Sequence, residues 1–341
     1  MRSPAGRAPR LAAMTTRWGI AGTGAMAEAF VADFEHVPDA EVVAIGSRTR
    51  ERAEAFAASY GIPGAFTYGE LLRADLDVLY VATPHPQHHA LALAAVEAGL
   101  PVLVEKAFTA TLAGAREVVT AAREHGVFCM EAMWTRLQPA VVEAKRLVDS
   151  GEIGELVAVQ ADLGAHRTYD PVSRLFDPVL GGGATLDLGV YVISLAQHFL
   201  GTPDRVVASG TLYPNGTDAQ VTTHLAYDDG RGASLACGLT TESPGRAVVW
   251  GTGGSIELPP RFHHPTSLVL RRNGHDAETI ELPPRGRGYS HEIEEVGRCL
   301  AAGLTESPVV PLADTLGVQW VMEETLTQLG IAPFEGLVDL S

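Results

Sequence analysis

The chain has 341 residues, of which 46% are hydrophobic and 19% charged, and its formal net charge is -16 at pH 7. This composition is typical of a well-packed globular protein and argues against disorder. The negative charge argues against nucleic acid or an anionic membrane surface as a partner. No apolar run approaches the roughly 18 residues of a transmembrane helix. A chain of this length predicts two domains.

The first 13 residues are rich in Arg, Pro and Ala and lack the apolar segment of a secretory signal. We expect residues 1–13 to be a disordered tail or the product of a start assigned too early, because Met14 directly precedes the first expected strand. The three cysteines, Cys129, Cys237 and Cys299, are far apart and form no CxxC motif. They predict buried thiols in a reducing compartment, hence a cytoplasmic location.

Strands and helices alternate at short spacing between residues 17 and 136. Apolar strand patterns occur in RWGIAG, EVVAIGSR, DVLYVATP, LPVLVEKAF and VFCMEAMW, and helical patterns separate them. Gly61 and Gly99 stand where two of these helices should end. The alternation predicts a parallel sheet covered by helices on both faces.

The pattern changes after a helix expected at 139–149. Residues 155–164 alternate as in a strand, and 205–282 contains several β-rich runs separated by turn sequences such as PNG and DDGRG. In one run, four alternating residues are expected to share a face: Val221, Thr223, Leu225 and Tyr227. A strongly apolar helix is expected at 185–201, and further helices at 289–302 and 313–329.

The predicted fold class is therefore an α/β Rossmann dinucleotide-binding domain followed by an α+β domain with a large, mainly antiparallel open sheet. We place the first domain at residues 14–136 and the second at residues 137–341.

The motif GTGAMA follows the first strand and opens a helix. In a G-x-G-x-x-A sequence, glycines allow a tight turn and a close approach to a pyrophosphate, which the helix N-terminus then binds. Gly22, Gly24, Ala25 and Met26 are therefore candidate cofactor-binding residues.

The end of the second strand indicates which cofactor is bound. An NAD site usually has an acidic residue here to bind the ribose 2′-OH, whereas this chain has Ser47 and Arg48. Glu41 lies at the opposite end of the strand. A hydroxyl and a guanidinium suit a 2′-phosphate, so we predict NADP, with NAD as a possible alternative.

The motif TPHPQHH follows the third of these strands and contains three histidines. A zinc site would need further converging ligands, and none is evident nearby, so no metal is predicted. We expect Thr83 and Pro84, at the carboxyl end of the strand, and His88, at the start of the next helix, to contact the cofactor.

One of only two lysines, Lys106, follows Glu105 at the end of another parallel strand, and we expect both to face the cofactor crevice. Asp187 and Tyr191 are four residues apart on a helix and share a face. The glycine run 181–183 before them indicates close backbone approach. On its own, Tyr191 is equally consistent with core packing, and Asp187 with favourable charge at a helix N-terminus.

Four motifs in this order, GTGAMA, TPHPQHH, VEKAF and GGGATLDLGVY, resemble the Gfo/Idh/MocA oxidoreductase family over residues 17–330. MEAMWTRLQP and RLFDP are similar to its branch of NADP-dependent D-xylose and dimeric dihydrodiol dehydrogenases. The family has Glu-Lys-Pro where this chain has Ala107. The resemblance implies that Lys106, Asp187 and Tyr191 are catalytic. It also implies that Trp134 and Arg136 lie beside cofactor and substrate, and that a homodimer or homotetramer forms through the second sheet.

Tyrosine and lysine both start near a pKa of 10, too high for a base at neutral pH. We expect Lys106 and Tyr191 to meet across a cleft, where the ammonium favours the phenolate and burial lowers the pKa of the lysine. Tyr191 is the preferred acid/base and Lys106 the second choice, with Asp187 orienting a hydroxyl. Arg174, in the loop at 164–180, is a further candidate substrate contact.

The sequence therefore predicts an NADP-dependent oxidoreductase acting on a sugar, cyclic polyol or vicinal diol. Two alternatives are an NAD-dependent glycoside hydrolase of the same fold and a non-catalytic cofactor-sensing regulator. Ser47 and Arg48 disfavour the first, and the complete set of proton-transferring residues disfavours the second.

Overall fold

The computed structural model describes residues 15–340, so the expectation for residues 1–13 lies outside the described part. The first sheet has six parallel strands in the order β3-β2-β1-β4-β5-β6. This is the strand order of a dinucleotide-binding domain, in which ligands bind where the order reverses, here between β1 and β4. Its strands are β1 (Thr16–Ala21), β2 (Ala40–Ser47), β3 (Gly64–Thr67), β4 (Val78–Val81), β5 (Val102–Glu105) and β6 (Cys129–Ala132).

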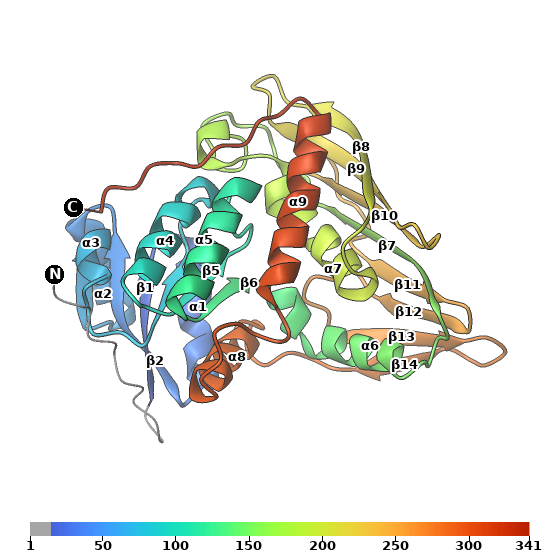
Figure 1. Cartoon of the computed structure of the whole chain (residues 1–341), viewed down its shortest axis with the longest axis horizontal. Helices are drawn as coiled ribbons and strands as arrows, with labels where there is room; N and C mark the ends of the chain where they lie inside the picture. The colour runs from blue at the N-terminus through green and yellow to red at the C-terminus, as the bar shows by residue number, and fades with distance from the viewer. Residues whose placement is uncertain (1–14, 341) are drawn as a thin grey trace.

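Helices cover both faces of this sheet, as predicted (Figure 1). They are α1 (Ala25–Asp33), α2 (Arg50–Tyr60), α3 (Tyr68–Leu71), α4 (His88–Glu97) and α5 (Leu112–His125), with short 3-10 turns η1 (Phe34–His36), η2 (His85–Gln87) and η3 (Trp134–Leu137). Gly61 and Gly99 have positive φ just beyond α2 and α4, which confirms both predicted helix ends. Strand β3 and helix α3 were not predicted from the sequence.

The second sheet has eight strands in the order β14-β13-β12-β11-β7-β10-β9-β8. It is mainly antiparallel, as predicted, with one parallel pair between β7 and β10. Its strands are β7 (Leu156–Gly164), β8 (Arg205–Leu212), β9 (Asp218–Ala226), β10 (Gly232–Gly238), β11 (Ala247–Gly251), β12 (Gly254–Leu258), β13 (Ser267–Arg272) and β14 (Glu278–Glu281).

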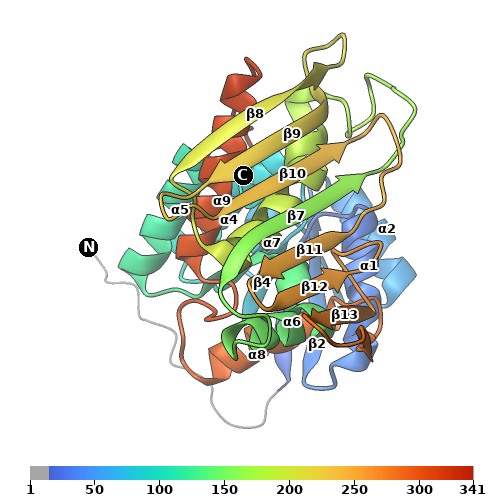
Figure 2. The ribbon, with the colours of Figure 1, turned by 90° about the vertical axis from the view of Figure 1, so that its right-hand side faces the viewer.

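Three of the four helices of this second half pack on one face of the sheet and leave the other uncovered (Figure 2), whereas α8 (Ser290–Ala301) contacts η1 and η3 instead. The other three are α6 (Pro139–Asp149), α7 (Val190–Leu200) and α9 (Leu312–Gln328), with the turns η4 (Pro178–Leu180) and η5 (Thr185–Gly189). The alternation predicted along β9 is confirmed: Val221, Thr223, Leu225 and Tyr227 are all buried.

Helix α7 and the residues before it form the most apolar segment of the chain. The stretch Pro178–Leu200 has the length and composition to cross a membrane, with a mean hydropathy of 1.6, but 72% of its apolar window is buried inside the fold. Helix α7 packs against β7 and α9. Such burial is expected of the core helix of a globular domain.

The end of the chain returns to the first domain. After α9, the C-terminal segment crosses to the nucleotide-binding half (Figure 1), where Val338 and Leu340 pack against its hydrophobic core. The carboxylate of Glu335 accepts hydrogen bonds from the backbone N–H and the hydroxyl of Thr111, at 2.8 and 2.7 Å, where α5 begins. We call residues 331–340 the C-terminal strap.

Candidate active site

The turn between β1 and α1 has the geometry that a pyrophosphate requires. Gly22 has φ of +128°, and a Cβ there would lie 2.4 Å from the Ala82 carbonyl oxygen, so only glycine fits. A Cβ at Gly24 would meet nothing within 4 Å, and no side chain caps the N-terminus of α1. The first N–H groups of α1, around Ala25 and Met26, are therefore free to bind phosphate oxygens.

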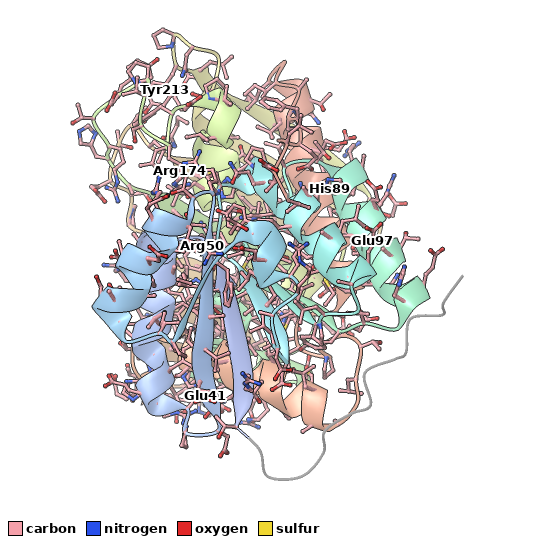
Figure 3. The ribbon with its side chains drawn as sticks, turned by 90° about the vertical axis from the view of Figure 1, so that its left-hand side faces the viewer. Glu41, Arg50, His89, Glu97, Arg174 and Tyr213 are labelled. Atoms are coloured by element: carbon pink, nitrogen blue, oxygen red, sulfur yellow. The ribbon has the colours of Figure 1, made fainter. Side chains whose placement is uncertain are left out.

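The end of β2 lies next to this turn. The Ser47 hydroxyl is buried, 3.5 Å from the Thr23 hydroxyl. Arg48 is exposed and forms no ion pair within residues 15–340, whereas Arg50 pairs with Glu70. Arg50 lies near one end of the strands and Glu41 near the other (Figure 3), so Glu41 is remote from the phosphate-binding turn. An exposed, unpaired guanidinium beside a hydroxyl fits a 2′-phosphate.

The histidines after β4 join neighbouring segments. His88 is fully buried, and its ring nitrogens lie 2.8 Å from the Ala107 carbonyl oxygen and 2.7 Å from that of Thr83. His88 thus links the loops that follow β4 and β5. His85 Nδ1 lies 3.1 Å from the Gly181 carbonyl oxygen, which ties the first domain to the glycine run of the second. The Thr83 hydroxyl has no hydrogen-bond partner among the described residues.

Lys106 reaches from the first domain to the second. Its Nζ donates to the Asp187 backbone carbonyl at 2.9 Å and lies 3.4 Å from the Asp187 carboxylate. The same Nζ lies 4.8 Å from the centroid of the Tyr191 ring. The expected convergence of amine and phenol is therefore present. Asp187 belongs to the π-helical turn η5, and Tyr191 to the first turn of α7.

The expectation that burial lowers the pKa of Lys106 is wrong for the net effect. Burial does act in that direction, but the electrostatic interactions with Tyr191, Asp187 and Glu105 outweigh it and raise this pKa above its usual value. Lys106 is therefore an ammonium at physiological pH. This charge state suits a hydrogen-bond donor and electrostatic partner rather than a proton acceptor.

Asp187 is the anionic centre of the cluster. Burial would raise its pKa, but Lys106, Arg174 and His85 together hold it below the usual range, so Asp187 is ionised. Arg174 Nη2 lies 3.4 Å from the Asp187 carboxylate, and its side chain is 46% exposed. Arg174 lies between the two domains (Figure 3). The structure thus brings this predicted substrate contact to the catalytic candidates.

The surroundings of Tyr191 raise the pKa of its phenol on balance, so the expectation that the Lys106 ammonium favours the phenolate is wrong for the net effect. Burial raises its pKa, the Lys106 ammonium lowers it, and the Glu105 and Asp187 carboxylates raise it further. An interaction with the indole of Trp134 also lowers the pKa of Tyr191. Trp134 Nε1 is buried without a hydrogen-bond partner of normal geometry among the described residues. Trp134, predicted beside cofactor and substrate, therefore lies next to the candidate acid/base.

Glu105 lies differently from its predicted place. Its carboxylate is buried and accepts a 2.5 Å hydrogen bond from the Tyr80 hydroxyl, so it points into the protein rather than into the crevice. The same carboxylate accepts a hydrogen bond from the Lys106 backbone N–H at 3.1 Å, so Glu105 stays close to Lys106 without facing the crevice. Burial raises the pKa of Glu105. Glu292, which the sequence analysis did not find, is buried nearby with both carboxylate oxygens unpartnered among the described residues.

Two aromatic neighbours of the site were also not predicted. Tyr289 stacks on Trp134, with ring centroids 4.5 Å apart and planes 8° from parallel. The ring centroid of His263 lies 5.2 Å from that of Tyr191. Burial lowers the pKa of His263 to about 3, so this ring is neutral. Neither residue stands in a recognisable motif.

Arg136 is not part of the cluster. It is fully buried, and its guanidinium donates to the hydroxyl and carbonyl of Ser194 and pairs with Asp314 at 2.5 Å. It holds η3 against α7 and α9, away from Lys106. Within residues 15–340, no group of three or more His, Cys, Asp or Glu side chains could hold a metal ion.

The arrangement is suited to moving a proton beside a bound dinucleotide. It joins a phosphate-binding turn, an ammonium at the carboxyl end of β5 and a buried phenol from the facing domain. A phenol beside an ammonium can take a hydroxyl proton while the adjacent carbon loses hydride. A bound oxidised nicotinamide supplies the hydride acceptor for such a reaction.

Two family models match the chain. Residues 16–133 match an oxidoreductase family with an NAD-binding Rossmann fold, and residues 141–257 match the GFO/IDH/MocA C-terminal domain. Together they span both sheets. The match to the first domain agrees with the observed strand order and glycine turn.

Curated relatives match nearly the whole chain. The trans-1,2-dihydrobenzene-1,2-diol dehydrogenase of Xenopus laevis is 36% identical over 93% of this chain and 99% of its own length. The human enzyme of the same name is 34% identical over 93% and 98%.

Solved structures agree. A 3-ketoreductase from Actinomadura kijaniata, solved with NADP, is 26% identical with a TM-score of 0.78, covering 92% of this chain and 97% of its own. A levoglucosan dehydrogenase solved with NADH shares the fold, with a TM-score of 0.84 at 21% identity and coverage of 92% and 97%. The chain belongs to the Gfo/Idh/MocA family of NAD(P)-dependent oxidoreductases.

Proposed function

We propose that this protein is an NADP-dependent dehydrogenase of a vicinal diol, with sugars and cyclic polyols as related substrates. The contact of Lys106 with Asp187 and with the Tyr191 ring carries the proposal, because it assembles a proton-transfer group from two domains. The dihydrodiol dehydrogenases that match 93% of the chain support the substrate class.

Each residue of the cluster has a proposed role. Tyr191, as phenolate, accepts the proton of the reacting hydroxyl as hydride leaves the adjacent carbon. Lys106 stabilises the phenolate, because it remains an ammonium between two carboxylates. Asp187, held by Lys106 and Arg174, orients a substrate hydroxyl. Arg174 and Trp134 border the substrate. In the reverse direction, Tyr191 donates the proton to a carbonyl oxygen.

Arg48 determines the preference for NADP in this proposal. Arg48→Ala should raise the KM for NADP by about 10-fold or more, the size of effect expected when a charge-assisted contact to phosphate is lost. The KM for NAD should stay nearly unchanged, because NAD lacks the 2′-phosphate. Equal losses for both cofactors would contradict the assignment. The matched control for Arg48→Ala is Arg52→Ala, which removes another exposed arginine, on α2.

A spectrophotometric panel tests the function itself. Purified protein is mixed with NADP or NAD and with trans-dihydrodiols, D-xylose, other aldoses and inositols, and formation of the reduced cofactor is followed by absorbance. The proposal predicts net reduction of NADP with a diol or sugar. Release of a sugar from a glycoside without net cofactor reduction would favour the glycoside hydrolase alternative. Cofactor binding without any turnover would favour the regulatory one.

We further propose a cytoplasmic protein that associates through the uncovered face of its second sheet (Figure 2). Trp250 on β11 and Val207 on β8 are 42% and 52% exposed on this sheet. Apolar side chains on an uncovered sheet suit a second copy of the chain. The mass measured by light scattering after gel filtration should be that of a dimer or tetramer. Trp250→Asp should shift this mass toward that of the monomer. A monomeric parent protein would contradict the proposed association.

A further inference from the structure

The turn that carries Tyr289 is held by a carboxylate from the other domain. Asp33, the last residue of α1, is 1% exposed. It accepts backbone hydrogen bonds from Arg287 at 2.9 Å, Tyr289 at 2.7 Å and Ser290 at 3.1 Å. Ser290 begins α8, and the cap residue Tyr289 supplies no side-chain cap of its own. Asp33 therefore satisfies N–H groups that would otherwise be unpaired at this helix end.

A second buried side chain also holds this turn. The Gln138 side-chain amide donates to the Gly288 carbonyl at 3.1 Å and to the Trp134 carbonyl at 3.0 Å. Gly288 has φ of +102°, and a Cβ there would lie 2.7 Å from the Gln138 side-chain oxygen, so this close contact requires glycine. The amide thus fixes the backbones of the two segments that carry the stacked rings of Trp134 and Tyr289.

These contacts connect α1 to the candidate acid/base. Phe30, also on α1, lies 6.3 Å from Tyr289, which stacks on Trp134. The ring of His263 links this stack to the acid/base, because its centroid lies 6.1 Å from that of Trp134 and 5.2 Å from that of Tyr191. The helix whose N-terminus presents free N–H groups for a phosphate therefore ends on a residue that fixes the aromatic stack beside Tyr191. Across nine residues the two ends of α1 are about 13 Å apart.

We propose that Asp33 is a positioning residue, which holds the Trp134–Tyr289 stack against Tyr191 through the turn at 285–290. Asp33 touches neither Lys106 nor Tyr191, and it acts through the backbone of Tyr289. Its role in turnover rests on the proposed function, whereas its effect on the stack does not.

The test compares Asp33→Asn with Asp39→Asn, the same substitution at an exposed position nearby. The substitution at position 33 keeps the size of the side chain but places an amide against backbone donors. We expect Asp33→Asn to lower kcat by about 10-fold or more and to raise substrate KM, as a small misplacement of a catalytic group would. Cofactor Kd should stay unchanged.

A double-mutant cycle separates positioning from general damage. Tyr289→Leu should reproduce the loss of Asp33→Asn, Tyr289→Phe should retain activity, and the double variant Asp33→Asn/Tyr289→Leu should be no worse than either single one. Both single variants should also change the near-ultraviolet circular dichroism of the aromatic stack, without an additive change in the double variant. The proposal is wrong if the losses of activity in the two single variants multiply in the double variant. It is also wrong if folded Asp33→Asn has the same near-ultraviolet circular dichroism spectrum as the parent protein.

Two further outcomes remain decisive. If Asp33→Asn does not fold, Tyr289→Leu with unchanged kcat, KM and spectrum overturns the proposal, and a loss rescued by Tyr289→Phe supports it. If the parent protein turns over no compound of the panel, the proposed function fails, but the spectroscopic cycle still decides whether Asp33 positions the stack.

Discussion

Lys106 and Lys145 show what distinguishes a functional lysine in this arginine-rich chain. Lys145 lies on the surface of α6 and pairs with Asp149 one turn away, at 2.5 Å, as its helical spacing predicts. Lys106 is nearly buried and contacts a backbone carbonyl, a carboxylate and a phenol ring of the facing domain. A compact ammonium suits three such close contacts, whereas a planar guanidinium would need more room.

Replacing Lys106 by Arg should therefore separate chemistry from binding. We expect kcat to fall by about 100-fold or more, because the larger cation cannot take the place of the ammonium beside the Tyr191 ring. Cofactor Kd, measured by fluorescence titration, should change little. Lys145→Arg is the matched control and should leave both quantities unaltered. Full activity of Lys106→Arg would show that no specific ammonium position is required.

At the scale of elements, long periodic segments were predictable and short irregular ones were not. Helices α2 and α5 and the alternation along β9 follow from patterns of apolar residues. Strand β3 has four half-buried residues and no apolar run, so nothing distinguishes it from a loop. The π-helical turn η5 is likewise not visible in the sequence, although it lies at the site, as such turns often do.

The residues of the candidate site likewise divide into those that the sequence made predictable and those that it did not. Lys106, Asp187 and Tyr191 stand in motifs and were found. Asp33, Tyr80, Tyr289 and Glu292 were not, because their roles depend on partners in distant parts of the chain. Asp33, for example, meets backbone groups more than 250 positions later. Only the fold brings such groups together.

The end of β6 predicts a pH-dependent stability. Glu131 is buried, and burial raises its pKa to about 7 against 4.5 when unfolded. A raised folded-state pKa means that the folded protein binds more protons between these values, so stability falls as pH rises from about 4.5 to about 7. Glu131→Gln removes this titration. The melting temperature of Glu131→Gln minus that of the parent protein should therefore be larger at pH 7.5 than at pH 5. The expected increase corresponds to about 3 kcal/mol in the free energy of unfolding.

Thermal melts of both proteins across this pH range make the comparison, and other titrating groups cancel because they are common to the two. A difference in melting temperature that stays constant with pH would contradict the assignment of this transition to Glu131.

At the scale of the whole molecule, the two domains are joined by contacts on several sides of the cleft. Lys106 and His85 link them at the site, Asp33 links them through the turn at 285–290, and the C-terminal strap crosses back to α5 (Figure 1). Gly336 N–H also donates to the Pro86 carbonyl at 2.6 Å, directly after His85. The strap therefore contacts the loop that carries a residue of the site.

Glu335→Ala tests this contribution. It removes the acceptor of the Thr111 contacts, and hydrogen bonds to a charged group each contribute about 1.5–3 kcal/mol. We expect a lower melting temperature and faster proteolysis of the C-terminal end. Glu97→Ala, exposed on α4 in the same half of the molecule (Figure 3), is the control. An unchanged melting temperature for Glu335→Ala would show that the strap does not stabilise the joined domains.

The central claim is that Tyr191, with Lys106 beside it, takes the hydroxyl proton as hydride leaves the substrate. A single-turnover experiment with excess enzyme, NADP and the best substrate of the panel tests it most directly, by comparing the rate of cofactor reduction in the parent protein and in Tyr191→Phe. We predict that Tyr191→Phe binds cofactor normally but reduces it about 100-fold or more slowly. Equal rates in the two proteins would contradict the account.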